Sequence, residues 1–112
     1  MKKEDYIYNA HVVAVYDGDT ITVDIDLGFN IIMKNQKIRL SGIDTPELRK
    51  EEREAGLISR DWLREKILDK KIVIKTYKDK TEKYGRWLAD IYIDDIFINE
   101  IMLQEGLAVK YV

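Results

Sequence analysis

Residues 20–27 read TITVDIDL, and this alternation is the clearest fold signal in the chain. Apolar side chains fall on every second residue, and polar side chains fall between them. Because successive residues of a strand point to opposite faces, the pattern predicts a strand with one face in a core and the other in solvent. A β-rich apolar run at residues 11–16 precedes it, and the turn signal Asp-Gly-Asp at residues 17–19 separates the two. Two successive strands are therefore expected here.

Three further strands can be recognised downstream. Residues 31–40 are expected to form the third strand, interrupted near Asn35. Residues 72–77 and 87–93 are apolar and β-rich and predict two more strands. The two acidic residues at 94–95 indicate a hairpin turn after the last of these.

The strongest helix signal follows the third strand. Thr45 is suited to the N-cap, Pro46 to the first helical position, and Glu47 to the positive end of the helix dipole. The residues that then recur at three- and four-residue spacing are Ala55, Ile58, Ser59, Trp62, Leu63 and Ile67. Residues 99–105 predict a second, short helix closed by Gly106.

The order of these elements indicates the fold class. Three strands, a helix, two strands and a short helix suit a mainly β fold with α elements (α+β). The architecture that we expect is a five-stranded OB-fold barrel, with a helix inserted after strand 3 and a short C-terminal helix. A chain of 112 residues is large enough for one domain and too small for two, so residues 1–112 are expected to form a single domain.

Composition limits the kinds of function. The formal charge of -2 means that the chain is not a polycation that coats nucleic acid, so any such contact must come from a local site helped by a bound cation. The absence of cysteine excludes disulfides and thiolate metal sites. Neither an apolar signal core nor a run of transmembrane length is present. We expect a soluble protein, cytoplasmic by default and secreted if a leader was removed.

Two acidic residues lie at the ends of predicted strands, where a barrel can bring them together. Asp19 and Asp44, with the backbone carbonyl of Thr45 and water, would form an all-oxygen site that favours Ca²⁺ or Mg²⁺ over zinc. Asp17 could orient a metal-bound water without touching the ion. The alternative is that residues 17–20 form only a hairpin turn, in which Asp and Gly are preferred for backbone reasons.

A base and two phosphate-binding groups complete the set. Glu47 could act as a general base that holds a water in line with a phosphate, or it could serve only the start of a helix. Arg39 and Arg86 carry planar guanidinium groups, which grip two phosphate oxygens and stabilise the charge of a pentacoordinate transition state. Their alternative is the ordinary one for arginine, a solvated surface position. Trp87 either lines the same site or packs inward from its strand.

These residues resemble the staphylococcal nuclease (thermonuclease) family. The resemblance runs from about Val12 to Ala108, and its motifs appear in the order and near the spacing of the family. The matching segments are Asp17-Gly-Asp-Thr20, Ile38-Arg-Leu40, Gly42-Ile-Asp-Thr-Pro-Glu47, residues 79–86 ending in Lys-Tyr-Gly-Arg, Asn99-Glu100 and Gln104-Glu-Gly-Leu-Ala108.

The resemblance implies a reaction and a cofactor. The reaction is Ca²⁺-dependent cleavage of the P–O5′ bond in DNA and RNA, which leaves 3′-phosphates and has little sequence specificity. The implied Ca²⁺ ligands are Asp19, Asp44 and the carbonyl of Thr45. Glu47 is the implied base.

Four residues are implied to contact the substrate. Arg39 and Arg86 would hold the phosphate and stabilise the transition state, and Lys83 and Tyr84 would touch a neighbouring phosphate. The expected partners are DNA and RNA, with single-stranded or denatured nucleic acid preferred. We expect no membrane partner and a monomeric protein.

The chain also departs from the family pattern. It is acidic where well-studied secreted members are basic, and the segment after Glu47 is shorter than the mobile loop of the family. It ends at Val112, so we expect it to lack the C-terminal helix of the family. Tyr111 could replace a nucleotide-stacking tyrosine, although its spacing differs.

Two other functions fit parts of this evidence. The alternative to an enzyme is a non-catalytic nucleic-acid-binding module on the same barrel. The presence of all five acidic and arginine residues favours the enzyme; these residues are Asp19, Arg39, Asp44, Glu47 and Arg86. A purely structural cation site would leave the two arginines unexplained.

Overall fold

The computed structural model describes residues 6–78 and 86–111. The strands are β1 (Tyr6–Asp17), β2 (Thr20–Asp26), β3 (Ile32–Leu40), β4 (Ile43–Asp44), β5 (Lys71–Lys78), β6 (Trp87–Ile93), β7 (Ile96–Phe97) and β8 (Val109–Lys110). The helices are the 3-10 turn η1 (Lys50–Glu52), α1 (Arg53–Ile67) and α2 (Ile98–Gln104). None of the helices in this part of the chain has both the length and the apolar character needed to cross a membrane.

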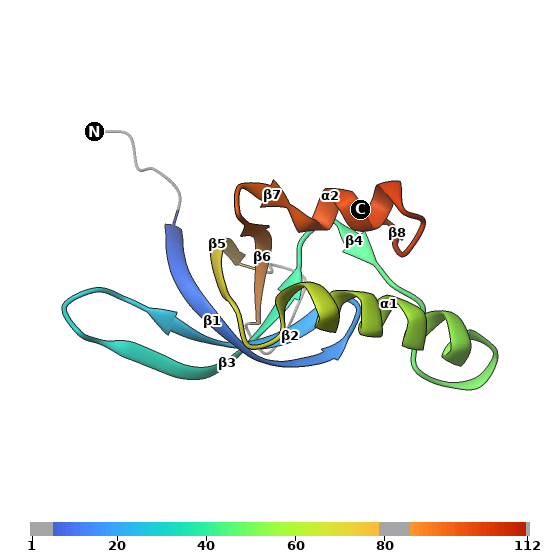
Figure 1. Ribbon diagram of the computed structural model, residues 1–112, viewed down its shortest axis with the longest axis horizontal. Helices are drawn as coiled ribbons and strands as arrows, with labels where there is room; N and C mark the ends of the chain where they lie inside the picture. Colours follow the sequence, from blue (N-terminus) through green and yellow to red (C-terminus); the bar gives the residue numbers. More distant parts are fainter. Residues whose placement is uncertain (1–5, 79–85, 112) are drawn as a thin grey trace.

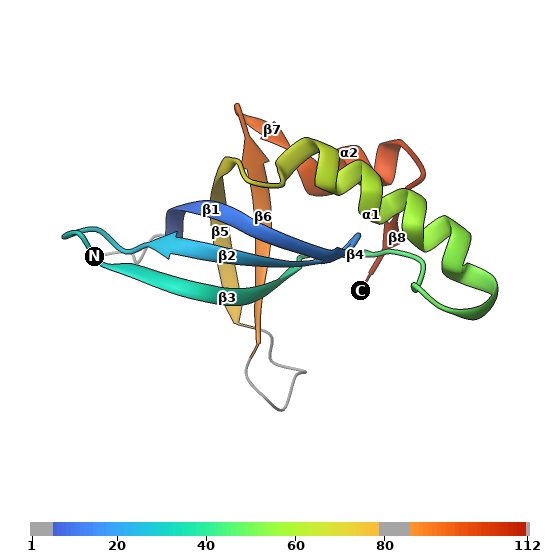
Figure 2. The same cartoon turned by 60° about the horizontal axis from the view of Figure 1, so that its bottom comes forward.

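Five of the described strands close into a barrel (Figures 1 and 2). They are hydrogen-bonded in the order β3-β2-β1-β5-β6, and a parallel pairing of β3 with β6 closes the ring. The short β7 extends the sheet beside β6, and β4 pairs with β8 in a second small sheet. The predicted fold class, a five-stranded barrel with a helix inserted after strand 3, is confirmed.

The alternation of residues 20–27 acts as predicted as far as the strand extends. Ile21, Val23 and Ile25 are buried in the barrel core, whereas Leu27 is 42% exposed. The strand ends at Asp26, and Leu27 lies beside Ile25 in the lining of the open end of the barrel, where it stays accessible to solvent. The hairpin of β2 and β3 projects from the barrel beyond this point (Figure 1).

The third strand is interrupted at Asn35, as predicted. Asn35 has a φ of 55°, and its backbone N–H donates to Oδ1 of Asp24 at 2.9 Å. The strand register slips at this point, between the pairs Val23–Gln36 and Ile25–Met33. The slip lets β3 resume its alternation toward the end that carries Arg39.

The start of the first helix differs from the prediction. Thr45, Pro46 and Glu47 do not begin a helix; they lie in an extended loop, and α1 starts only at Arg53. The backbone N–H of Thr45 donates to the Asp19 carboxylate at 3.1 Å, so this residue is bound to the β1–β2 turn. The local helix-start signals are therefore overridden by a contact with another part of the chain.

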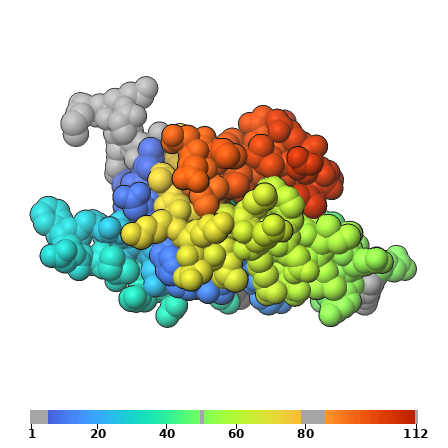
Figure 3. All heavy atoms as spheres, viewed as in Figure 1, coloured from blue at the N-terminus to red at the C-terminus, as the bar shows by residue number. Residues whose placement is uncertain are grey.

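The buried face of α1 is also narrower than predicted. Gly56, Ser59, Leu63 and Ile67 are its buried residues, and Trp62 packs at the edge of the core. The predicted inward positions Ala55 and Ile58 are instead exposed. The spheres of α1 and of the C-terminal segment adjoin in Figure 3, and the Ser59 hydroxyl donates to the Leu107 carbonyl at 2.6 Å.

The second helix is α2, close to where it was predicted. Gly106, with a φ of 72°, follows it. Asn99 is 2% exposed and joins three segments: its amide nitrogen donates to the carbonyls of Ser41 and Ala89, and its oxygen accepts the N–H of Ile91. These bonds fix the turn after β3, which leads directly into β4 and the segment of residues 44–49, called the acidic loop below.

Candidate active site

A cleft of about 460 Å³ lies where the β1–β2 turn, the end of β3, the loop after β4 and the start of β6 meet. Seven residues predicted from the sequence line it together: Asp17, Asp19, Arg39, Asp44, Thr45, Glu47 and Arg86. The other two predicted residues, Lys83 and Tyr84, lie outside the described residues. The roles of all nine stay predictions.

The β1–β2 turn presents Asp19 to the cleft. The backbone N–H of Asp19 donates to Oδ1 of Asp17 at 3.0 Å, and the Thr20 hydroxyl donates to Oδ1 of Asp19 at 3.2 Å. Oδ2 of Asp19 accepts the backbone N–H of Thr45. Asp19 is only 7% exposed, so its carboxylate is held in one orientation.

Gly18 allows the turn to approach its neighbours closely. A Cβ at this position would lie 2.8 Å from Cγ2 of Thr45 and 2.9 Å from Cβ of Ser59. Real side chains do not pack at such distances, so any larger residue would push the β1–β2 turn away from the acidic loop and from α1. The sequence identified the turn but not this reason for its glycine.

Arg39 joins the two acidic residues. Its Nη2 lies 3.3 Å from Oδ2 of Asp19 and 3.1 Å from Oδ1 of Asp44, and its Nη1 donates to the carbonyl of Ile43 at 3.1 Å. The side chain leaves β3 on the face opposite Ile38, as predicted. Arg39 is nevertheless buried, with only 8% of its surface exposed, because the acidic loop folds over it. The alternative of a solvated surface arginine does not apply.

The C-terminal segment supports this arrangement. Strand β8 pairs with β4, and the N–H of Tyr111 donates to the Gly42 carbonyl at 2.9 Å. The ring of Tyr111 consequently faces Arg39, whose guanidinium carbon lies 4.7 Å from the ring centroid. Within the described residues, Tyr111 is thus an aromatic neighbour of the phosphate-binding candidate.

Glu47 lies at the outer edge of the cleft. Its side chain is 61% exposed, and Oε2 accepts the Nε–H of Arg49 at 2.9 Å. Its backbone N–H donates to the Glu52 carboxylate at 3.1 Å. Gly56 makes room for the loop, since a Cβ there would lie 2.5 Å from the Glu47 carbonyl oxygen.

The sequence analysis missed the roles of two residues, Arg49 in this loop and Gly56 in α1. Arg49 lines the cleft and pairs with Glu47. In the sequence, only its position two residues after Glu47 indicated this contact. A glycine inside a helix ordinarily only weakens it. The packing role of Gly56 depends on a contact that no local pattern reveals.

Arg86 reaches the cleft from the other strand of the closing pair. It immediately precedes β6, in which Trp87 is paired with Ile38 and Leu88 with Arg39. The parallel pairing therefore brings Arg86 to the same wall of the barrel as Arg39. Its side chain is exposed and lines the cleft.

The acidic turn is electrostatically crowded. Burial raises the pKa of Asp17 to about 6, and the neighbouring Asp19 carboxylate acts in the same direction. Like charges at this distance disfavour simultaneous ionisation, whereas a cation or guanidinium group stabilises both. Arg39 provides such a positive charge on the Asp19 side of the turn.

The donors present are those of a hard cation. Carboxylates and a backbone carbonyl are the ligands that Ca²⁺ and Mg²⁺ take, and none of the described residues that line the cleft carries a softer ligand. Within residues 6–78 and 86–111, no three His, Cys, Asp or Glu side chains are grouped so as to hold a metal ion. The chemistry of the donors, two carboxylates and a backbone carbonyl, is that of a cation that would keep several waters.

Comparison with known proteins places this cleft in context. The family described as "Staphylococcal nuclease homologue" matches residues 37–112, which include Arg39, Asp44, Glu47 and Arg86. The chain is 34% identical over 100 residues to a protein named thermonuclease from Staphylococcus hyicus, covering 87% of this chain and 56% of that protein.

Two further relatives carry endonuclease names. Endonuclease YncB of Bacillus subtilis (strain 168) is 32% identical over 116 residues, covering 99% of this chain and 52% of that protein. Probable endonuclease LCL3 of Candida glabrata is 42% identical over 81 residues, covering 66% of this chain and 31% of that protein. The chain spans about half the length, or less, of these curated relatives.

Proposed function

The chain belongs to the staphylococcal nuclease homologue family, and from this membership we propose that it is a nuclease that hydrolyses phosphodiester bonds in DNA and RNA. The observation that carries the proposal is the convergence on one cleft of two carboxylates joined by Arg39, a carboxylate on the cleft edge and a second arginine. Relatives named thermonuclease and endonuclease support the same activity.

The cofactor that we propose is Ca²⁺, held by Asp19, Asp44 and the carbonyl of Thr45. When bound, it supplies charge stabilisation to a phosphate oxygen. The chain contributes the orientation of the ligands. Asp19 is fixed by the Thr45 N–H and the Thr20 hydroxyl, so the carboxylate needs little reorganisation to bind a cation.

Glu47 is the proposed base. Its carboxylate is at the cleft edge, where water has access, and the contact with Arg49 restricts its orientation. It would take a proton from a water whose oxygen attacks phosphorus, while the P–O5′ bond breaks on the opposite side. The 5′ oxygen leaves with a solvent proton, and the phosphate remains on the 3′ side.

The two arginines are proposed to bind the phosphate. Arg39 uses three N–H contacts on protein oxygens within the described residues, and a guanidinium group has five N–H donors. Two donors can therefore turn to phosphate oxygens. Arg86, which lines the same cleft, is proposed to stabilise the charge that develops as the phosphorus becomes pentacoordinate.

A cleavage assay with a single-stranded DNA labelled at one end tests the proposal. We expect cleavage with added Ca²⁺, 3′-phosphate product ends, and loss of activity with a chelator. Undiminished cleavage in the chelator would exclude the proposed cofactor. Binding of the DNA without any cleavage, under a range of divalent ions, would instead support the alternative of a non-catalytic module.

A further inference from the structure

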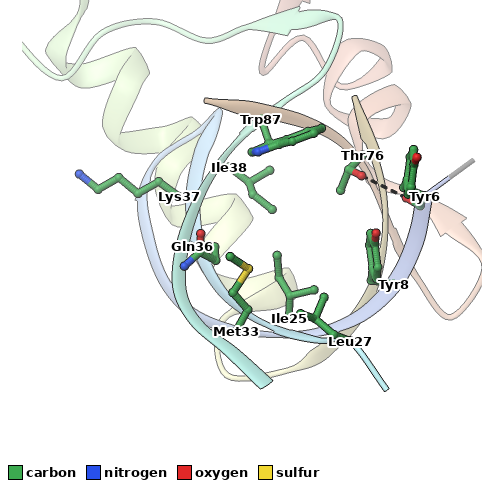
Figure 4. A pocket seen from close by; sticks show the side chains of 10 residues that line it. All are labelled: Tyr6, Tyr8, Ile25, Leu27, Met33, Gln36, Lys37, Ile38, Thr76 and Trp87. Carbon is green, nitrogen blue, oxygen red and sulfur yellow. Dashed lines mark hydrogen bonds between the residues drawn. The ribbon is translucent and has the colours of Figure 1, made fainter. Parts of the chain in front are cut away.

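A second concave surface lies at the open end of the barrel, at the end opposite the β1–β2 turn (Figure 4). This barrel-mouth groove has a volume of about 430 Å³, within the usual range of small-molecule sites. Its lining residues are Tyr6, Tyr8, Ile25, Leu27, Met33, Gln36, Lys37, Ile38, Thr76 and Trp87. The proposed hydrolysis uses none of them.

The groove and the active-site cleft share one wall. Ile38 and Trp87 are paired across the parallel β3–β6 junction and line the groove, while the next residue of β3 is Arg39 and the preceding residue of the chain is Arg86. Because successive strand residues point to opposite faces, the groove lies inside the barrel wall and the cleft outside it. A chain bound to both would cross the rim near Lys37, whose side chain points away from the groove in Figure 4.

Four exposed large hydrophobic side chains line the groove: Tyr6, Leu27, Met33 and Trp87. Trp87 is 44% exposed and its ring lies across the opening, and Tyr6 and Met33 are similarly exposed. Nζ of Lys78 lies 5.0 Å from the centroid of the Trp87 ring, which brings a positive charge to the rim. An aromatic platform bordered by cations has the chemistry that binds single-stranded nucleic acid.

We propose that the barrel-mouth groove binds an unstacked nucleobase of the nucleic acid strand whose phosphate occupies the active-site cleft. This rests on the proposed nuclease function. The base would stack on Trp87, and its polar edge would meet Gln36 and Thr76. Bases inside a duplex cannot leave their stack without an energetic penalty, so the groove selects single strands.

Two observations favour a nucleobase over other occupants. The groove and the cleft with the phosphate-binding candidates lie on the two sides of one β3–β6 wall, where Ile38 and Trp87 adjoin Arg39 and Arg86 in sequence. The cations Lys37 and Lys78 border the groove. Their positive charge complements a phosphate backbone and would not contribute to the binding of an apolar lipid chain.

Tryptophan fluorescence tests the groove independently of catalysis. Trp62 and Trp87 are the two tryptophans of the chain, so Trp62→Phe leaves Trp87 as the sole emitter. In chelator, we expect an oligothymidylate to quench this emission at a concentration about fivefold to a hundredfold lower than an abasic phosphodiester of equal length, the range for one stacked base. Equal, unquenched binding of both would overturn the proposal. So would emission that changes with protein concentration alone, which would indicate a second copy.

A kinetic comparison uses a matched pair of aromatic variants. The ratio of kcat/KM for a thymidine oligonucleotide to that for its abasic counterpart should fall several-fold in Trp87→Ala and stay at the parent value in Phe29→Ala. Phe29 is 96% exposed on the β2–β3 hairpin and does not line the groove. An unchanged ratio in a folded Trp87→Ala protein would refute the subsite. If the parent cleaved neither substrate, the nuclease function would fail while the fluorescence titration still decided the groove.

Discussion

The guanidinium carbon of Arg39 lies 4.7 Å from the centroid of the Tyr111 ring, which covers one face of the group. The same guanidinium bonds Asp19 and Asp44 through its edge. The C-terminal segment, anchored by the bond from Tyr111 to Gly42, thereby helps to hold the centre of the cleft.

Replacing this ring tests its positioning role. Tyr111→Ala should lower kcat/KM about threefold to tenfold, because a cation–π contact of this kind contributes about 1 kcal/mol. Tyr111→Phe keeps the ring and should retain the parent rate. Equal losses in the two variants would show that the hydroxyl group, and not the contact with Arg39, is what matters.

Removing the exposed arginine should separate chemistry from folding. Arg86→Ala is expected to lower turnover by about two to three orders of magnitude, since it removes a donor aimed at developing charge. The melting temperature should change little because the side chain is exposed. Arg60→Ala, on α1 and outside the cleft, is the matched control. Near-parental turnover of Arg86→Ala would remove this residue from the site.

The base role of Glu47 can be tested with a pair of loop variants. Glu47→Gln keeps the shape but loses basicity, so turnover should fall about 10²-fold or more. Arg49→Gln keeps the carboxylate and releases its partner, so a smaller loss is expected. If Glu47→Gln turns over at the parent rate, Glu47 is only a loop residue.

The close approach at Gly18 links stability with activity. Gly18→Ala should destabilise the fold by about 1–3 kcal/mol, because the added Cβ meets Thr45 and Ser59. Activity should fall as well, since a shift of about 1 Å in a reacting group can reduce the rate about 10²-fold. Gly28→Ala is the control: it adds strain at a φ of 82° but meets no neighbour, so only stability should change. Calorimetry and the cleavage assay together measure both effects.

The pH dependence of stability should report on Asp24. The backbone N–H of Asn35, and then the Lys34 ammonium group, lower the pKa of Asp24 below its ordinary value of 3.8. This interaction stabilises the fold above pH 3.8 and is lost as the pH falls through the lower folded-state pKa. Asp24→Asn should therefore be less stable than the parent at pH 7, and the gap should close in strong acid. A gap that does not narrow as the pH falls below 3.8 would contradict the assignment; urea unfolding measures it.

The strands were predictable because their evidence is local. The alternation around Ile21 and Val23 and the irregularity at Asn35 are visible in a few consecutive residues. The start of α1 was not, since the signals at Thr45 and Pro46 are those of a helix, whereas the Asp19 carboxylate takes the N–H of Thr45. The bond between Thr45 and Asp19 joins segments that are distant in sequence, so it exists only in the folded chain.

The same distinction applies to the candidate site. Residue types and spacing were enough to bring Asp19, Asp44 and the two arginines into one hypothesis, and the structure places them around one cleft. The bridging position of Arg39 and the contacts that require Gly18 depend on packing between distant segments. Such contacts have no counterpart in a short stretch of sequence.

The parallel junction of β3 and β6 also bears on how the molecule forms. Arg39 and Arg86 lie on segments that are distant along the chain and meet only when β3 and β6 pair. Contacts between such distant segments form slowly, because chain entropy is lost before the stabilising contacts form. After dilution from denaturant, the recovery of cleavage should thus lag behind the recovery of the circular dichroism signal of the β-hairpins. The rate at which activity returns would then report the rate of barrel closure.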